Sequence, residues 1–212
     1  GLARCGMNAA GICITANYLE SDRDYRTPGV PLALIRRRVL EQQHMAMAMK
    51  AVATTPKACS NNMMVSHVGG FAIDFECAPD ESFPIYPEDG LLVHANHWVS
   101  PVALSKLVDT GIPSVPESFY RDWRVRRHLD GCGRKLTPED LKQAFFDDYE
   151  TPHSVCRPPR PSERGNLSAT VAMIIMDPTA GIMEVCPLPA LSRGGFTTYT
   201  LTVQDAVAAA AE

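Results

Sequence analysis

The stretch Gly6-Met7-Asn8-Ala9-Ala10-Gly11-Ile12-Cys13-Ile14-Thr15-Ala16-Asn17-Tyr18 decides the fold class of this chain. Its two ends are rich in apolar and β-branched residues, and the part between them has the composition of a tight turn. We therefore predict a hairpin whose strands cover Arg4–Met7 and Gly11–Tyr18. Only antiparallel strands can be joined by so short a connection.

A helix is predicted after the hairpin. Pro31 suits the first turn of a helix, and an apolar, Ala/Met-rich stretch continues from it to Ala51. We expect one long helix over residues 31–51. Met45, Met47 and Met49 alternate instead of following a helical stripe, and methionine fills irregular core space, so we interpret them as core residues and not as a metal or cofactor site.

The rest of the chain is predicted to pass from strands to helices and back to strands. Short apolar runs between turn residues predict strands over Met63–Val65, Phe71–Phe75, Leu91–Val93, Ser168–Met176, Ile182–Val185 and Phe196–Val203. Helical spacing predicts helices over Pro116–Leu129 and Thr137–Phe146, the second with Thr137 as its N-cap. Because strands and helices do not alternate, we predict an α+β fold of antiparallel sheet, in a single domain over residues 1–212.

The composition excludes several classes of protein. The chain has 212 residues, of which 45% are hydrophobic and 21% charged, and this is too apolar for a disordered chain. A formal net charge of -4 provides no basic footprint for nucleic acid or an anionic membrane. No apolar run reaches the ~18 residues of a membrane span. The 7 cysteines are odd in number and widely spaced, so we expect reduced thiols and a cytoplasmic location.

Val93-His94-Ala95-Asn96-His97-Trp98 is the stretch most suggestive of chemistry, because hydrogen-bonding side chains follow directly on a predicted strand. Asn96 could donate an amide N–H to a developing oxyanion, where one donor lowers the barrier by roughly 3 kcal/mol. Strand alternation would put His94 and His97 on opposite faces, which argues against a metal site. From the residues alone, a purely structural role for the segment is the alternative.

No nucleophile motif stands out. The chain lacks a Gly-x-Ser-x-Gly elbow, a Gly-rich phosphate loop and zinc-ligand spacing. Ser154-Val155-Cys156-Arg157 gathers a hydroxyl, a thiol and a guanidinium, but the nearby prolines favour an ordered loop. The arginines from 121 to 127 indicate a solvated, salt-bridged helix face. A cysteine of this chain activated by His94 or His153 is a further alternative.

Several motifs, taken in order, resemble one enzyme family. They are Gly6-Met7-Asn8-Ala9-Ala10-Gly11-Ile12, Asn17-Tyr18-Leu19, Thr27-Pro28-Gly29-Val30-Pro31, Val93-His94-Ala95-Asn96-His97, Ser118-Phe119-Tyr120-Arg121 with Arg124, Ser154-Val155-Cys156-Arg157 and Ile174-Ile175-Met176-Asp177. Over essentially the whole chain they resemble the acyl-coenzyme A:6-aminopenicillanic acid (isopenicillin N) acyltransferase family. The resemblance implies an N-terminal-nucleophile (Ntn) αββα sandwich of antiparallel sheets covered by helices.

The resemblance also implies a mechanism. Members of the family cut their own precursor just before a cysteine, whose thiol then attacks an amide or thioester carbonyl while its α-amino group can act as the base. The acyl-enzyme passes its acyl group to water or to an amine. By position, Asn96 matches the family's oxyanion-hole asparagine, and Arg164 matches an arginine near the nucleophile. Asn8 and Tyr18 are expected to bind substrate because they lie at the ends of the predicted hairpin. His94 and His97, the neighbours of Asn96 in the motif, are expected to bind substrate too, with a structural role as the alternative.

In the family the nucleophile lies some tens of residues before the segment that matches Gly6-Met7-Asn8. We therefore expect it outside this chain, with Cys5 not its equivalent. Residues 1–212 would then be the C-terminal portion of a catalytic β chain, partnered by an N-terminal α chain or segment, and the oligomeric state stays open. Hydrolysis of a small-molecule amide is favoured, without cofactor or metal. The alternatives are a non-catalytic Ntn-like scaffold subunit and a true acyl-CoA-dependent acyltransferase.

Overall fold

The computed structural model describes residues 1–133, 135–161, 165–187 and 195–203. The described residues divide into two compact units: one of Gly1–Pro116, Pro178–Gly181 and residues 201–203, the other of the described residues within Glu117–Asp177 and Ile182–Thr200. The expectation of one domain over residues 1–212 stays a prediction. Among the described residues, no helix has the length and apolar character needed to cross a membrane.

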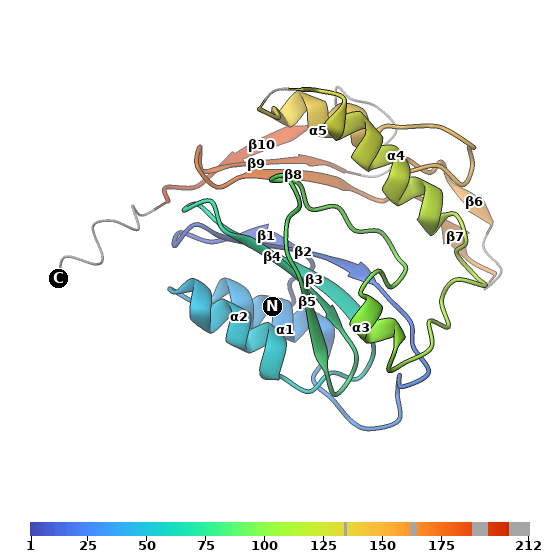
Figure 1. The fold of residues 1–212 in the computed structure, drawn as a ribbon. Helices are drawn as coiled ribbons and strands as arrows, with labels where there is room; N and C mark the ends of the chain where they lie inside the picture. Colours follow the sequence, from blue (N-terminus) through green and yellow to red (C-terminus); the bar gives the residue numbers. More distant parts are fainter. Residues whose placement is uncertain (134, 162–164, 188–194, 204–212) are drawn as a thin grey trace. The chain divides into compact units, whose positions relative to one another are not determined.

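The first unit is built on a five-stranded antiparallel sheet (Figure 1). In spatial order its strands are β1 (Gly6–Met7), β2 (Ile12–Tyr18), β3 (Asn61–His67), β4 (Ala72–Cys77) and β5 (Ser82–Ile85). The predicted hairpin is confirmed, with Gly6 opposite Ile14. Gly11 forms part of its turn with a φ of 74°, a conformation that glycine adopts without steric cost.

Two helices cover one face of this sheet (Figure 1): α1 (Leu32–Leu40) packs on β2, and α2 (Met45–Thr54) packs on β3 and β4. The prediction of one long helix over residues 31–51 is wrong, since α1 ends at Leu40 and α2 begins at Met45. A side chain from another element binds the chain at this break. Nδ2 of Asn8 donates to the carbonyl oxygens of Leu40 (3.0 Å) and Gln42 (2.8 Å), which pairs acceptors that a helix end leaves open.

Alternation along the strands gives the sheet an apolar face and a polar face. The apolar face packs against α1 and α2 and forms the main core, with Ile12, Ile14, Met63, Val65, Ile73 and Phe75 at most 5% exposed. The opposite face carries Asn62, Asp74 and Glu76, which are at most 1% exposed. Burying carboxylates is costly unless they are paired or hydrogen-bonded, so this polar face is the place to look for a function.

The segment after β5 differs from its prediction. No strand forms over Leu91–Val93, where the structure has only an isolated bridge between Glu88 and Leu91. The short helix α3 (Pro101–Leu104) follows, with Ser100 as its N-cap. Strand β5 was not predicted, because the proline-rich connection around it concealed a four-residue edge strand.

The second unit begins with α4 (Ser118–Asp130) and α5 (Pro138–Phe145). Its strands are β6 (Arg160–Pro161), β7 (Leu167–Ser168), β8 (Met173–Asp177), β9 (Ile182–Cys186) and β10 (Thr197–Thr200), paired as β10-β9-β8 and β6-β7. The predicted N-cap is confirmed as a capping box between Thr137 and Asp140. The strand predicted over Ser168–Met176 is interrupted between β7 and β8. Helix α5 packs on β8, over a small core of Met173 and Cys186.

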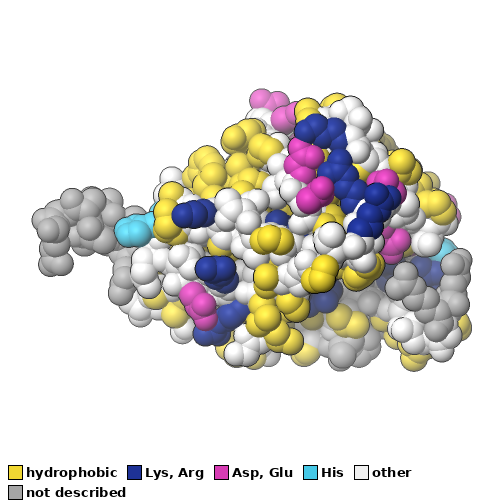
Figure 2. Space-filling model, turned by 90° about the horizontal axis from the view of Figure 1, so that it is seen from below, with side chains coloured by type: hydrophobic (Ala, Val, Ile, Leu, Met, Phe, Trp, Pro, Cys, Tyr) yellow, Lys and Arg dark blue, Asp and Glu magenta, His cyan; other side chains and the backbone are white. Residues whose placement is uncertain are grey.

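Charged side chains of both signs share the surface. On the face shown in Figure 2, basic and acidic side chains lie beside one another with hydrophobic side chains between them. Some are paired along helices, as Arg37 with Glu41 (2.8 Å). This mixture is in keeping with the 20 basic and 24 acidic residues of the chain.

Candidate functional site

Asn96 lies at the end of β2, on a segment without regular secondary structure. Its side chain is half-buried, and its Nδ2 donates to the main-chain oxygen of Tyr18, the last residue of β2 (2.9 Å). An amide donor whose orientation is set by a strand end is the kind of group that can stabilise developing negative charge on a substrate oxygen.

Glu76 of β4 binds this segment on both sides of Asn96. Its Oε1 accepts a hydrogen bond from the N–H of Val99 (2.6 Å) and contacts Nε2 of His94 (2.8 Å), and its Oε2 accepts from the N–H of Ser100 (3.0 Å). The carboxylate is 0% exposed. Hydrogen bonds to an ionised carboxylate are roughly twice as strong as neutral ones, so Glu76 is the principal tie between β4 and the segment.

Further hydrogen bonds connect the segment to β2 and to the residues after α3. Nδ2 of Asn17 donates to the carbonyl oxygen of His94 (2.6 Å). The indole Nε1 of Trp98 donates to the carbonyl oxygen of Glu20 (2.9 Å), and its main-chain N–H donates to Oδ2 of Asp109 (3.1 Å). Residues 94–98 are therefore held from several directions within the first unit.

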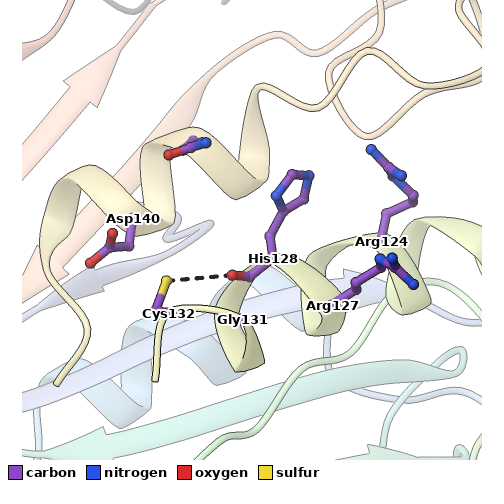
Figure 3. A pocket seen from close by; sticks show the side chains of 7 residues that line it. Arg124, Arg127, His128, Gly131, Cys132 and Asp140 are labelled. Carbon is purple, nitrogen blue, oxygen red and sulfur yellow. Dashed lines mark hydrogen bonds between the residues drawn. The ribbon is translucent and has the colours of Figure 1, made fainter. Parts of the chain in front are cut away.

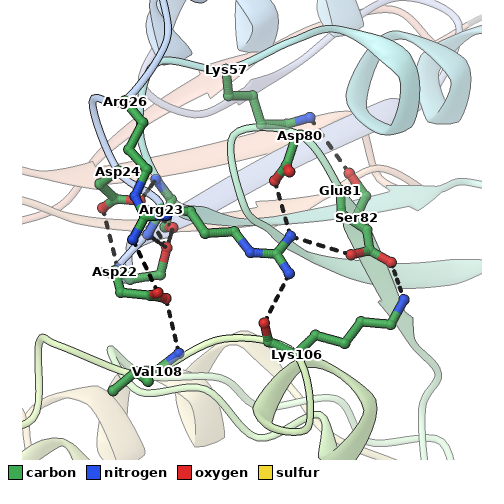
Figure 4. A network of polar contacts seen from close by, with 12 residues as sticks. Asp22, Arg23, Asp24, Arg26, Lys57, Asp80, Glu81, Ser82, Lys106 and Val108 are labelled. Atoms are coloured by element: carbon green, nitrogen blue, oxygen red, sulfur yellow. Dashed lines mark hydrogen bonds and ion pairs between the residues drawn. The ribbon is translucent and has the colours of Figure 1, made fainter.

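A charged network supports the residues that anchor Trp98 (Figure 4). Nη1 of Arg23 pairs with Asp80 (3.1 Å) and Glu81 (3.3 Å), and its Nη2 donates to the carbonyl oxygen of Lys106 (2.9 Å). Oδ1 of Asp22 accepts from the N–H of Val108 (3.0 Å). The network thus joins the residues after β2 to the segment that leads to Asp109.

His94 and His97 lie on the same side of the segment. Their rings stack with centroids 6.4 Å apart and planes at 23°. The prediction that they point to opposite faces is wrong, because residues 93–97 do not form a strand and strand alternation does not apply. Within the described residues, no group of three or more His, Cys, Asp or Glu side chains could hold a metal ion.

The surroundings of His94 favour its cationic form. Its side chain is 1% exposed, with Nε2 bonded to Glu76 and Nδ1 to the carbonyl oxygen of Ala95 (3.0 Å). A carboxylate and a carbonyl only accept, which suits a ring that carries hydrogen on both nitrogens. Burial lowers the pKa of His94, but the hydrogen bond to Glu76 and the charge of Asp74 together raise it by more. The pKa of His94 therefore lies above its ordinary value.

Asp74 is a second buried carboxylate on β4. It is 0% exposed, Nδ2 of Asn62 donates to its Oδ2, and its Oδ1 has no hydrogen-bond partner among the residues that the structure describes. Burial raises the pKa of Asp74 from 3.8 to about 6, against the opposing effect of the nearby His94 charge, and Glu76 adds to the rise. Asp74 therefore gains a proton in a range where ordinary aspartates remain charged.

Four cysteines of this chain, Cys5, Cys59, Cys77 and Cys156, do not have the surroundings of activated nucleophiles. All seven lie in the described part, none forms a disulfide, and only Cys5 and Cys132 are more than marginally exposed. Burial raises the pKa of the thiols of Cys5, Cys59 and Cys156, and that of Cys77 to about 11. A raised pKa leaves little of the reactive thiolate at neutral pH.

A pocket of about 330 Å³ lies between α4 and α5 and contains both a cysteine and a histidine (Figure 3). Nε2 of His128 bonds Oδ2 of Asp147 (2.9 Å), while Sγ of Cys132 contacts the main-chain oxygen of His128 (3.4 Å). The imidazole is thus engaged with a carboxylate, and the thiol with the backbone. This arrangement does not make the pocket a cysteine–histidine nucleophile site.

The structure brings together four of the six residues that the sequence singled out, namely Tyr18, His94, Asn96 and His97. Asn8 lies at the other end of β2, where its amide bonds α1 and its Oδ1 accepts from the N–H of Ile12 (3.0 Å). Arg164 lies outside the described residues. Glu76 was missed, because alternating charged and apolar residues usually mark a strand face turned to water. Asn17 was noted only as part of a motif, with no role assigned to it.

Comparison with known proteins identifies the family of the chain. The chain matches the family described as acyl-coenzyme A:6-aminopenicillanic acid acyl-transferase over residues 3–187. The chain belongs to this family. The membership expected from the motifs is confirmed, and the matched range includes Glu76, His94, Asn96 and His97. No curated protein matches the chain.

Three solved structures show the fold of this acyltransferase-family chain. Two variants of conjugated bile acid hydrolase from Clostridium perfringens match with TM-scores of 0.63 and 0.60 at 11% and 12% identity, each over 94% of this chain and 73% of the other. Penicillin V acylase from Agrobacterium tumefaciens matches with a TM-score of 0.55 at 14% identity, over 96% of this chain and 68% of the other. The antiparallel α+β architecture therefore matches the Ntn-hydrolase fold.

Proposed function

We propose that this chain supplies the oxyanion-binding part of an autoprocessed Ntn enzyme that cleaves a small-molecule amide. The observation that carries the proposal is the amide of Asn96, held at the end of β2 by the Tyr18 carbonyl, on a segment bound by the buried carboxylate of Glu76. The family and the fold support the same chemistry.

The reaction proceeds through a cysteine thiol and an acyl-enzyme. The thiolate attacks the amide carbonyl, whose oxygen becomes negative and accepts a hydrogen bond from Nδ2 of Asn96. The C–N bond then breaks, the amine leaves with a proton, and a thioester remains. Water attacks the thioester, releasing the carboxylic acid and restoring the thiol.

The attacking cysteine is not one of the seven in this chain. The burial and raised pKa values of Cys5, Cys59, Cys77 and Cys156 support this assignment. The nucleophile belongs to an N-terminal part of the protein, which we propose as the partner of residues 1–212. This part provides the thiol and its α-amino base, and the present chain provides Asn96.

Hydrolysis is proposed over transfer because the similar structures are named as a hydrolase and an acylase. None of the described site residues is assigned to the binding of coenzyme A. The substrate is accordingly a small N-acyl amide.

A panel of small N-acyl amides tests this proposal. The complete protein should release free amine from at least one of them, penicillin V and conjugated bile acids included, without added acyl-coenzyme A. Pretreatment with a thiol-alkylating reagent should abolish the release, because the acyl-enzyme needs a free thiol. Activity that requires an acyl-coenzyme A donor would show the acyltransferase alternative, and the absence of both reactions would favour a scaffold subunit.

A further inference from the structure

We propose that Glu76 is the positioning residue of the oxyanion segment, a role that rests on the function proposed above. It does not touch the substrate. It acts by binding the imidazole of His94 before Asn96 and the main-chain N–H groups of Val99 and Ser100 after it, and this fixes where the Asn96 amide points.

The geometry assigns this role to Glu76 in particular. Its Oε1 binds Val99 N–H (2.6 Å) and His94 Nε2 (2.8 Å), and its Oε2 binds Ser100 N–H (3.0 Å). A single side chain therefore holds the residue two positions before Asn96 and the residues three and four positions after it. No neutral side chain could accept all three of these hydrogen bonds with both of its terminal atoms.

The support behind Glu76 is rigid. Strand β4 lies inside the sheet between β3 and β5, with Glu76 opposite Asn62 on one side and Phe83 on the other. Phe83 packs edge-on against Trp98, with ring centroids 6.1 Å apart, so the same strand pair also supports the far side of the segment. The carboxylate is thereby fixed before any substrate binds.

The consequence for catalysis follows from the demands of an oxyanion donor. A displacement of about 1 Å of a positioning group can cost about 100-fold in rate, even when the chemical groups are intact. If Glu76 loses its bonds, residues 94–100 can shift while Asn96 stays present. Loss of Glu76 should then resemble a partial loss of Asn96 in its effect on kcat.

The test compares Glu76→Gln with two reference variants in the complete protein. The glutamine keeps the shape of the side chain but replaces one acceptor oxygen with an NH2 group that faces donors. Lys57→Met is the matched control, because Lys57 is also buried (2% exposed) and its Nζ donates to the carbonyl oxygens of Val52 (2.7 Å) and Thr55 (2.9 Å), away from the oxyanion segment. Asn96→Ala reports whether the oxyanion role itself holds.

We expect Glu76→Gln to lower kcat for amide cleavage by at least about 10-fold with KM within about 3-fold, since the donor and not the substrate pocket is displaced. Lys57→Met should lower the melting temperature but leave kcat within about 2-fold. A folded Glu76→Gln protein with unchanged kcat, or an equal loss of kcat in Lys57→Met, overturns the proposal. If Asn96→Ala leaves kcat unchanged, the proposed function itself falls.

Asn17→Ala keeps the proposal testable if Glu76→Gln does not fold. It removes the hydrogen bond to the His94 carbonyl (2.6 Å) from a half-buried position and leaves Glu76 in place. Because it loosens the same segment from the other side, we expect kcat to fall about 3- to 10-fold at unchanged KM. Unchanged kcat in a folded Asn17→Ala protein would contradict the view that the position of residues 94–100 limits the rate.

Discussion

Asn96→Ala should lower kcat for amide cleavage at least about 100-fold and change the free energy of unfolding by only about 1 kcal/mol. In the proposed function, the alanine removes the donor to the developing oxyanion, and this loss weakens binding of the transition state more than binding of the substrate. It also removes the hydrogen bond to the Tyr18 carbonyl, an exposed contact of 2.9 Å whose net contribution to stability is small. Steady-state kinetics and urea unfolding of the complete protein measure the two effects.

Ser60→Ala is the control for Asn96→Ala. Ser60 is 0% exposed, and its Oγ bonds Asp24 (2.5 Å) and Ser21 (2.8 Å), away from residues 94–100. We expect it to cost about 1–3 kcal/mol of stability while kcat remains near that of the wild type. If Asn96→Ala turns over amide as fast as the wild type, or if Ser60→Ala is equally slow while folded, Asn96 is not the oxyanion donor.

Asp74→Asn should change how the stability of the protein depends on pH. The folded-state pKa of Asp74 is raised from 3.8 to about 6, so the folded protein binds this proton more tightly than the unfolded chain. The contribution of Asp74 to the free energy of unfolding is therefore fully present below about pH 4, and it is lost as the pH rises through about 6. The difference between the two pKa values corresponds to about 3 kcal/mol.

Between pH 4 and pH 7.5, we expect the free energy of unfolding of Asp74→Asn to rise relative to that of the wild type by up to about 3 kcal/mol. The reason is that asparagine has no charge to bury. Urea unfolding at intervals across this range measures the gain. Asp130→Asn, an exposed position on α4, should show a pH dependence like that of the wild type. A constant difference between Asp74→Asn and the wild type at every pH would mean that Asp74 has an ordinary pKa in the folded protein.

The features that could be predicted from the sequence are those set by local chemistry. The hairpin at residues 6–18 and the capping box at Thr137 follow from turn and cap residues within a few positions of one another. The break between α1 and α2 could not be predicted from local residues, since the side chain that binds the end of α1 is Asn8, which lies 32 residues before Leu40. The strand predicted over Leu91–Val93 was wrong for a similar reason. An apolar run does not show whether a partner strand lies beside it.

The candidate site was predicted in part for a similar reason. Asn96 and its neighbouring histidines were found through one short motif. Glu76 could not be found in that way, because a buried carboxylate and an exposed one give the same alternating pattern in a strand. Asn17 lay in a recognised motif, but the motif did not show which segment its amide binds. Their roles depend on which segment covers them, and here that is the segment that carries Asn96.

The identity of the acylated residue tests the central claim most directly. The complete protein, mixed with a cleavable amide and quenched in acid within the first turnover, should carry one acyl group by intact mass. Peptide mapping should locate it on the thiol of a cysteine other than Cys5, Cys13, Cys59, Cys77, Cys132, Cys156 and Cys186, and Asn96→Ala should form it at least about 100-fold more slowly. An acyl group on one of these seven thiols, or amide cleavage that proceeds with no acyl-enzyme, would contradict the account.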